Sequence, residues 1–519
     1  MLVKTYASAV HGVDARTIAV EVHAGGTPIL TGQFYFLVGL PDNAMKEGFQ
    51  RIEAALKSSG YHMYRVKTVV NLAPADLRKE GAAYDLPIAL AYISATNQVD
   101  LPELDRYVIL GELSLDGSLR PIKGALPIAI QARKENFKGI ILPRQNAREA
   151  AIVNNLEVYG VDNLKEAVKF LSGAIKLEPI VVDAREEFVS SRNHYDVDFS
   201  DVKGQENIKR ALEIAAAGGH NVILIGPPGA GKTMLARRLP TILPPLTLNE
   251  ALETTKIHSV AGLLPVNASL ITTRPFRSPH HTISDVALVG GGTNPHPGEI
   301  SLSHNGVLFL DELPEFKRGA LEVLRQPMEE RRVTISRAKT TVDYPAGFTL
   351  IASMNPCPCG YYNHPEKDCV CGAGVVKKYL NKISGPLLDR IDLHVEVTPV
   401  SYDELSSFNR PAESSHDIAQ RVVKARELQA ARFESHPHLH CNAQMPGKMV
   451  LEVCQVNPTG LALVKKAMER LQLSARAFDR ILKVSRTIAD LADSPNIEIE
   501  HLAEAIHFRS LDREDWVGV

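Results

Sequence analysis

The chain has 519 residues, a formal net charge of −2 at pH 7 and a hydrophobic content of 45%. The length predicts roughly three domains, and the near-zero net charge excludes a global basic field, so any nucleic-acid contact must come from a local patch. No apolar run reaches the ~18 residues that span a bilayer. Since the N-terminal segment also lacks a signal-peptide pattern, we expect a cytoplasmic protein without membrane contact.

Four regions follow one another along the chain, and together they predict an α/β protein. Apolar strand-like runs alternate with short helical runs in residues 1–173, and a polar linker is expected at 174–200. A P-loop module occupies residues 201–400. Apolar residues then recur at three- and four-residue spacing in 401–519, which predicts a helical domain. The helices expected there are Asp417–Phe433, Thr459–Leu471, Ala475–Leu491 and Ile499–Phe508.

The most informative motif lies between an apolar run at 222–225 and a helical run at 234–239. It matches the P-loop pattern in the strand–turn–helix setting that this pattern requires. Lys232 is expected to reach the β- and γ-phosphates of a nucleoside triphosphate, and Thr233 to bind Mg²⁺. The loop as a whole is Gly226-Pro227-Pro228-Gly229-Ala230-Gly231-Lys232-Thr233.

Further polar residues follow apolar strands downstream of this loop. The run 307–310 ends in Asp311, expected to hold Mg²⁺, and Glu312, expected to polarise the attacking water. A later strand ends in Asn355, which could bind the γ-phosphate or the water. Arg390 precedes another strand and suits an arginine finger acting on a neighbouring subunit, although a surface salt bridge explains it equally well.

Two segments offer basic side chains to a polymer. The stretch between Lys232 and Asp311 is longer than its expected elements need, and it contains Arg277 within an insertion that either meets phosphates or packs as a structural loop. Residues 331–344 alternate apolar and polar side chains around a polar tip, which predicts a β-hairpin. Three of its four basic residues are candidate phosphate contacts, the alternative being a solvated hairpin end. They are Arg332, Arg337 and, at the tip, Lys339.

Four of the six cysteines lie close together in the sequence. Two C-x-C pairs with this separation can close a tetrahedral Zn²⁺ site, and free thiols without metal are the alternative. The site is expected to be structural and to pin the loop before Arg390. Its ligands would be Cys357, Cys359, Cys369 and Cys371. Cys441 and Cys454 are expected to be ordinary small core residues.

The nucleotide-binding motifs together resemble the AAA+ ATPases. The resemblance assigns Walker A to 226–233, Walker B to 307–312, sensor 1 to Asn355 and the finger to Arg390. Arg476, in Ser474-Ala475-Arg476, is similar to sensor 2, and the Asp201–Gln205 segment is similar to the one beside the adenine pocket, which makes Gln205 a nucleotide contact.

Further motifs narrow the resemblance to the magnesium-chelatase-like branch and, within it, to the ComM/YifB family over essentially the full length. These motifs are Arg274–His281, Gly290–Gly292, Pro297–Leu302 and Ser384–Arg390. The resemblance implies a homo-oligomeric ring, usually a hexamer, with ATP and Mg²⁺ at subunit interfaces. It further implies a DNA helicase that acts on single-stranded and branched DNA, promotes branch migration in natural transformation and works beside other recombination proteins.

The N-terminal region resembles the Lon protease domain in the segments Lys79–Pro87, Gly111–Gly117, Arg120–Leu126 and Ile141–Pro143. Hydrolysis of the Lon type needs a serine nucleophile and a lysine base. The resemblance places Ala83 and Leu126 at those positions, so we expect an α+β domain without peptidase activity.

Three functions remain open at this point. The first is an ATP-driven DNA translocase or helicase. The second is a chelatase-type or protein-remodelling motor without a DNA substrate. The third, an active ATP-dependent protease, is disfavoured by Ala83 and Leu126.

Overall fold

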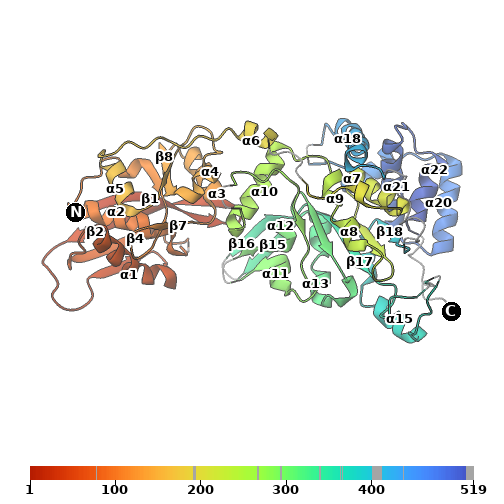
Figure 1. The fold of residues 1–519 in the computed structure, drawn as a ribbon, viewed down its shortest axis with the longest axis horizontal. Helices are drawn as coiled ribbons and strands as arrows, with labels where there is room; N and C mark the ends of the chain where they lie inside the picture. Colours follow the sequence, from red (N-terminus) through yellow and green to blue (C-terminus); the bar gives the residue numbers. More distant parts are fainter. Residues whose placement is uncertain are drawn as a thin grey trace. The chain divides into compact units, whose positions relative to one another are not determined.

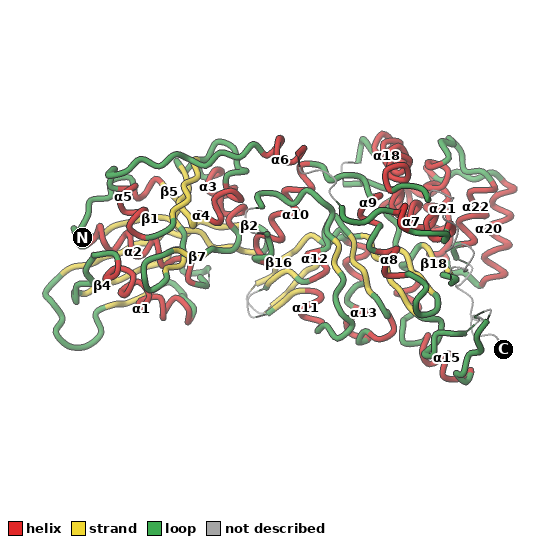
Figure 2. Tube along the Cα trace, viewed as in Figure 1, coloured by secondary structure: helices red, strands yellow, loops and turns green. Residues whose placement is uncertain are grey.

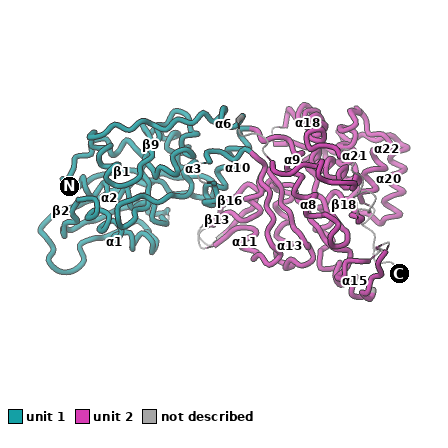
Figure 3. Tube along the Cα trace, in the orientation of Figure 1, with its two compact units in different colours: residues 1–191, 248–272 teal, residues 192–247, 273–519 magenta. Residues whose placement is uncertain are grey.

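The computed structural model (Figure 1) describes residues 1–77, 79–190, 195–265, 268–292, 295–337, 340–362, 364, 366–399, 412–436 and 438–509. The chain divides into two compact units (Figure 3). Unit 1 consists of Met1–Ser191 together with Leu248–Thr272, and unit 2 consists of Arg192–Thr247 together with Thr273–Val519. A piece of chain from between the two Walker motifs therefore belongs to the N-terminal unit.

Unit 1 is built on a seven-stranded mixed sheet in the order β3-β4-β2-β1-β5-β8-β9. Strands β1, β2 and β4 pair antiparallel, and the remaining pairs are parallel. The strands are β1 (Leu2–His11), β2 (Asp14–Gly25), β3 (Tyr35–Val38), β4 (Lys67–Ala73), β5 (Tyr107–Ile109), β8 (Gly139–Pro143) and β9 (Glu157–Val161), with a small hairpin of β6 (Glu112–Leu113) and β7 (Leu119–Arg120).

Helices α2, α3, α4 and α5 pack against this sheet, and α2 is buried along its whole length, in line with its almost uniformly apolar sequence. The helices of unit 1 are α1 (Asn43–Ser58), α2 (Asp85–Ala95), α3 (Ala125–Lys134), α4 (Arg144–Ala150), α5 (Leu164–Leu171), α6 (Ala184–Ser190) and α10 (Leu248–Ala261). The last of these comes from between the Walker motifs and docks on α3. The backbone N–H of Gly124 donates to the Ser259 carbonyl at 3.1 Å, and the Ser259 hydroxyl donates to the buried Glu149 carboxylate.

Unit 2 contains a five-stranded parallel sheet in the order β11-β14-β17-β10-β18. Figure 2 colours the strands yellow, with β18 labelled. Every residue of β10, β14 and β17 is buried, as expected for parallel strands covered on both faces. The strands are β10 (Val222–Ile225), β11 (Phe276–Arg277), β14 (Val307–Leu310), β17 (Thr349–Met354) and β18 (Leu393–Glu396). Because parallel strands end at one edge, the polar residues that follow β10, β14 and β17 are brought together there.

Short helices and two hairpins surround this sheet. The helices are α7 (Glu206–Gly218), α8 (Lys232–Ala236), α9 (Leu239–Ile242), α11 (Asp285–Val289), α12 (Glu299–Leu302), α13 (Arg318–Glu322), α14 (Arg325–Glu330), α15 (Ala373–Leu380) and α16 (Gly385–Leu388). The hairpins are β12 (Gly290–Gly291) with β13 (His296–Pro297), and β15 (Arg332–Arg337) with β16 (Thr340–Pro345). The second is the hairpin predicted from alternation, in the register Arg332↔Pro345 to Arg337↔Thr340.

The C-terminal part of unit 2 is helical, as predicted. Its helices are α18 (Ser415–Arg432), α19 (Gly447–Val453), α20 (Pro458–Leu471), α21 (Ala475–Leu491) and α22 (Ile499–His507). One hydrophobic core joins them to the sheet: Val222 and Leu224 of β10 belong to the same buried cluster as Val422 of α18 and Ile481 of α21. No helix in the described ranges is both long enough and apolar enough to cross a bilayer.

Candidate active site

The P-loop connects β10 to α8 and takes a conformation that depends on its glycines. Gly229 and Gly231 have φ of 79° and 83°, values that glycine adopts without strain. A Cβ at Gly226 would lie 2.3 Å from the Val397 carbonyl oxygen, so a side chain at Gly226 would displace the neighbouring backbone. A Cβ at Gly229 would instead meet nothing within 4 Å, which fits a loop that opens toward a ligand.

The Lys232 side chain is buried and lies across this loop. Its Nζ donates to the carbonyl oxygens of Gly226 at 2.6 Å and Pro227 at 2.9 Å, and to Oδ1 of Asn355 at 3.1 Å. Burial lowers the pKa of this ammonium from its ordinary value, and the carboxylates of Asp311 and Glu312 oppose that shift. The amine is thus held among acceptors that phosphate oxygens can replace.

A hydroxyl and a carboxylate suited to Mg²⁺ lie beside Lys232. Thr233 Oγ1 donates to Oδ2 of Asp311 at 2.8 Å, and the Ser353 hydroxyl donates to the other carboxylate oxygen. Oxygen donors of this kind are the ligands that Mg²⁺ prefers. When bound there with a triphosphate, the ion would neutralise developing charge on the phosphate oxygens. Sequence reasoning missed Ser353, although it lies two residues before Asn355 on the same strand and so faces the same side of the sheet.

Glu312 follows Asp311 in a left-handed conformation with φ of 54°. Its backbone N–H donates to Oδ1 of Asp311 at 3.1 Å, and its side chain is 56% exposed. His281 Nδ1 lies 3.3 Å from Oε2 of Glu312. The Glu312 carboxylate is therefore exposed beside His281, and the Arg274–His281 stretch reaches the site through a contact that the sequence did not indicate.

Arg390 is buried next to β18 and is held by its own chain. Its Nη2 lies 2.7 Å from Oε1 of Glu329, and its Nη1 donates to the Pro386 carbonyl at 2.6 Å. A cavity of about 480 Å³ adjoins this pair, lined by residues of α14 and β15 as well as by Arg390. The sequence indicated Arg390 but not its partner Glu329.

Arg476 lies in the first turn of α21 and is exposed. Ser474 caps that helix by accepting from the Ala477 N–H at 3.2 Å. Arg480, one turn further along, instead makes an ion pair with the buried Asp392 carboxylate.

The remaining predicted contacts have the following surroundings. Gln205 has φ of 61° and donates through Nε2 to the Thr398 carbonyl at 2.7 Å. Arg277 makes two hydrogen bonds to Glu299, at 2.6 and 2.7 Å. Arg332 on the hairpin is 58% exposed and pairs loosely with Glu330 at 3.4 Å. Lys339 and the side chain of Arg337 lie outside the described residues.

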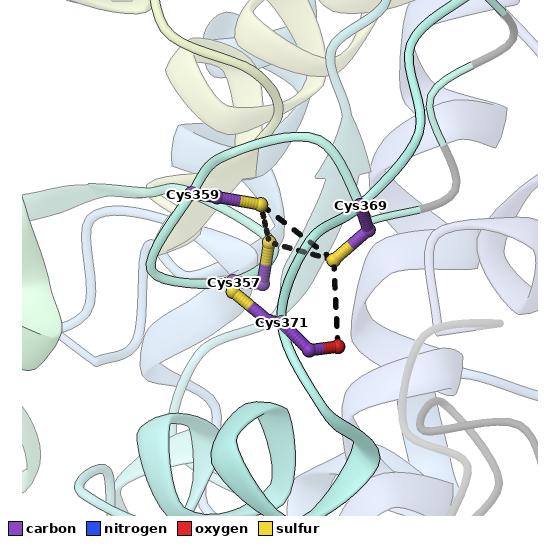
Figure 4. Close-up of side chains that lie close together, drawn as sticks. All are labelled: Cys357, Cys359, Cys369 and Cys371. Carbon is purple, nitrogen blue, oxygen red and sulfur yellow. Dashed lines mark hydrogen bonds between the residues drawn. The ribbon is translucent and has the colours of Figure 1, made fainter.

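The four clustered cysteines converge as predicted (Figure 4). Cys357 Sγ lies 3.3 Å from Cys359 Sγ and 3.6 Å from Cys369 Sγ, and Cys359 and Cys369 are also 3.6 Å apart. All four sulfur atoms, including that of Cys371, lie within 4.8 Å of one another. The thiols are free, and their spacing fits ligation of a single metal ion, because zinc–sulfur bonds of about 2.3 Å in a tetrahedron place sulfurs about 3.8 Å apart.

Comparison with known proteins accounts for most of this chain. Family models described as "Magnesium chelatase, subunit ChlI", "Subunit ChlI of Mg-chelatase" and "Magnesium chelatase, subunit ChlI C-terminal" match residues 198–405, 21–146 and 412–509. Competence protein ComM of Haemophilus influenzae is 42% identical over 509 residues, which cover 98% of this chain and 97% of that protein. The uncharacterized protein YifB of Escherichia coli is 45% identical over 506 residues, covering 97% and 96% of the two chains.

The chain belongs to the ComM/YifB family. The family's motor module is of the magnesium-chelatase-like AAA+ class, which implies ATP and Mg²⁺ as the ligands of the P-loop site. The Lys232, Thr233 and Asp311 geometry fits both.

The N-terminal unit of this ComM/YifB protein is Lon-like. Lon protease 2 of Bacillus subtilis is 30% identical over 154 residues, covering 27% of this chain and 26% of that protein. Ala83 lies in a short 3₁₀ turn before α2, and Leu126 is buried on α3. Neither side chain carries a nucleophile or a base, so the absence of peptidase activity stays a prediction with a chemical basis.

Proposed function

We propose that this protein is an ATP-driven DNA helicase or translocase that promotes branch migration when incoming DNA recombines during natural transformation. The observation that carries the proposal is the match along 98% of the chain to a protein named for competence. The assembled nucleotide site supports it, since Lys232 donates to Asn355 and the adjacent Thr233 donates to Asp311. In this proposal Glu312 orients the attacking water, and Gln205 and Arg476 border the bound nucleotide.

The working form in this proposal is a homo-hexameric ring with ATP at the subunit interfaces. Arg390 then acts on the triphosphate of the neighbouring subunit, where it stabilises the charge that develops on the transferred phosphoryl group. Arg390 pairs with Glu329 within its own chain, as the salt-bridge alternative expects, so the triphosphate of a neighbour must displace Glu329 in this proposal.

In this proposal the β15–β16 hairpin binds DNA. The whole chain has a net charge of −2, so phosphate contacts must be local. The hairpin offers Lys339 and Arg337 near its tip and the exposed Arg332 at its base. Arg277 is a secondary candidate because its guanidinium already makes two hydrogen bonds to Glu299.

We also propose Zn²⁺ as the ion of the four-cysteine cluster. A set of four thiolates is typical of closed, structural zinc sites, in which no position is left for a substrate.

A second candidate is a chelatase-type or protein-remodelling motor without a DNA substrate. Its support is that all three matching family models are described by a magnesium chelatase subunit. The two candidates differ in what should stimulate ATP hydrolysis.

The experiment that separates them is steady-state ATPase measured with and without single-stranded and forked DNA. We expect several-fold stimulation by DNA, and Lys339→Ala with Arg332→Ala should reduce it while basal hydrolysis is kept. The logarithm of the binding constant for single-stranded DNA falls linearly with the logarithm of the salt concentration. Each lost phosphate contact should make this slope shallower by about 0.7. Lys465→Ala, on the exposed face of α20, is the matched control. A rate of ATP hydrolysis that does not change when DNA is added would favour the second candidate.

A further inference from the structure

The four-cysteine cluster is joined to the ATP site at more than one point. The first connection is along the chain. Asn355 directly follows β17 and accepts a hydrogen bond from Lys232 Nζ at 3.1 Å, and the first cysteine, Cys357, follows two residues later. A shift of Cys357 is therefore passed to Asn355 through two peptide bonds, each of which is planar and stiff.

The second connection is a packing contact with the P-loop. The turn after Cys357 is closed by a hydrogen bond from the Gly360 N–H to the Cys357 carbonyl at 3.0 Å. Gly360 has φ of +86°, and a Cβ there would lie 2.5 Å from Cδ of Pro228. The cysteine turn thus rests directly on the loop that wraps the triphosphate, at a spacing that only glycine permits.

The third connection comes from the other side of the cluster. Helix α15 begins two residues after Cys371 and carries Tyr379, which is buried and lies beside the Asn355 backbone. Both ends of the cysteine-bearing segment therefore converge on Asn355. Burial raises the pKa of the Tyr379 phenol well above its ordinary value, so this partner stays a neutral hydroxyl.

The distances between the sulfur atoms indicate that a bound metal ion would fix the cysteine loop against the ATP site. The three measured sulfur–sulfur distances of 3.3, 3.6 and 3.6 Å are far longer than a disulfide bond of about 2.05 Å. They are close to the edge of a zinc tetrathiolate. Thiols at these distances attract one another only weakly, whereas one metal ion would bind all four cysteine sulfurs and so hold the two C-x-C pairs together.

We propose that metal occupancy of the four-cysteine site positions Asn355 and Pro228, so that the bound Zn²⁺ controls the rate of ATP hydrolysis. This inference rests on the proposed ATPase function. The cysteines touch no reacting atom and are positioning residues. Nucleotide binding depends mainly on Lys232 and the loop backbone. Hydrolysis in addition requires the Asn355 side chain to be placed correctly beside the γ-phosphate and the attacking water. Loss of the metal should therefore lower kcat far more than it weakens nucleotide affinity.

The test starts with metal content and its spectroscopic signature. Full-length protein purified under reducing conditions should contain about one zinc per chain, and replacement by Co²⁺ should give the absorption bands of a tetrahedral tetrathiolate site. Cys369→Ala should lose both. Cys454→Ala, a buried cysteine outside the cluster, should keep both. Wild-type protein without zinc and without the Co²⁺ spectrum would overturn the metal site.

The functional arm compares kcat with the affinity for a fluorescent ADP analogue. We expect Cys369→Ala to lower kcat at least tenfold while the affinity changes less than threefold. Chelator-treated wild-type protein should likewise lose kcat while keeping its nucleotide affinity, and it should regain kcat when Zn²⁺ is added. This second measurement decides the question even if the variant folds poorly. Unchanged kcat after zinc loss would overturn the positioning role. Zinc-loaded wild-type protein without ATPase activity would overturn the proposed function instead.

Discussion

At the scale of single residues, the central arrangement is the pair formed by the buried Arg390 and the exposed Glu329. The Arg390 side chain is only 6% exposed, and its Nε is buried without a hydrogen-bond partner among the described residues. A guanidinium with one satisfied and one unsatisfied edge is costly to bury. In the proposed ring, Arg390 exchanges Glu329 for an anion that satisfies more of its donors, the triphosphate bound to a neighbouring subunit.

Substitutions at this pair should act in opposite directions. Arg390→Ala should lower kcat of the oligomer by a factor on the order of 10³ while nucleotide binding is kept, because an arginine finger contributes mainly to the transition state. Glu329→Gln should raise kcat, since the neutral amide holds the guanidinium less firmly. Steady-state ATPase and nucleotide titration measure both effects.

The matched control for these substitutions is Glu322→Gln, which lines the same cavity but pairs with Arg325. It should leave kcat within about twofold. Full ATPase activity of the Arg390→Ala oligomer would place the finger elsewhere.

The sequence alone predicted those candidate residues of the site whose chemistry follows from a motif. Lys232, Thr233 and Asp311 follow strands of recognisable composition, and the structure places them in contact. The partners Ser353 and Glu329 were not predicted. Each reaches its place only when separate segments pack together, and no local pattern encodes that approach.

At the scale of elements, the predicted and observed helices of the C-terminal part agree closely. Helix α21 was predicted at Ala475–Leu491 and has those bounds, because its apolar residues repeat at helical spacing and Ser474 caps its start. Helix α10 is different. Its sequence gives no sign that it packs on α3 of unit 1, since that depends on the fit between Ser259 and the distant Glu149.

A buried polar junction ties α21 to the sheet of unit 2. His220, just before β10, bonds Thr487 of α21 at 2.8 Å and lies 3.5 Å from Asp392, which Arg480 also binds. Burial lowers the pKa of His220, and it lowers the pKa of His394 on β18 to about 3. Both imidazoles are thus kept neutral in the folded protein.

The free energy of unfolding should therefore depend on pH. Histidines whose pKa is depressed by folding bind fewer protons in the folded than in the unfolded state, so stability is present above about pH 6.5 and is lost as the pH falls below it. The loss can reach about 1.4 kcal/mol per pH unit for each histidine. Urea unfolding at pH 7.5, 6.5 and 5.5 measures it, and His394→Gln should flatten the dependence. His438→Gln, at an exposed site, should leave it unchanged, and an unaltered slope in His394→Gln would contradict this account.

At the scale of the whole molecule, the chain combines a Lon-like unit with an AAA+ motor. A segment from between the two Walker motifs, Leu248–Thr272, belongs to the N-terminal unit. Covalent continuity therefore links that unit to the motor at both ends of this segment as well as at Ser191. We expect ATP-driven changes between Lys232 and Asp311 to act on the N-terminal unit through it.

In the proposed function, ATP hydrolysis at this site moves DNA branches. The most direct measurement is displacement of a labelled strand from a three-stranded DNA junction by the full-length protein. We predict displacement with ATP and none with ADP. Glu312→Gln should bind ATP and DNA but displace nothing, because the attacking water is no longer activated. A wild-type protein that hydrolyses ATP yet leaves forked and three-stranded DNA intact, with or without a ring assembled, would contradict the account.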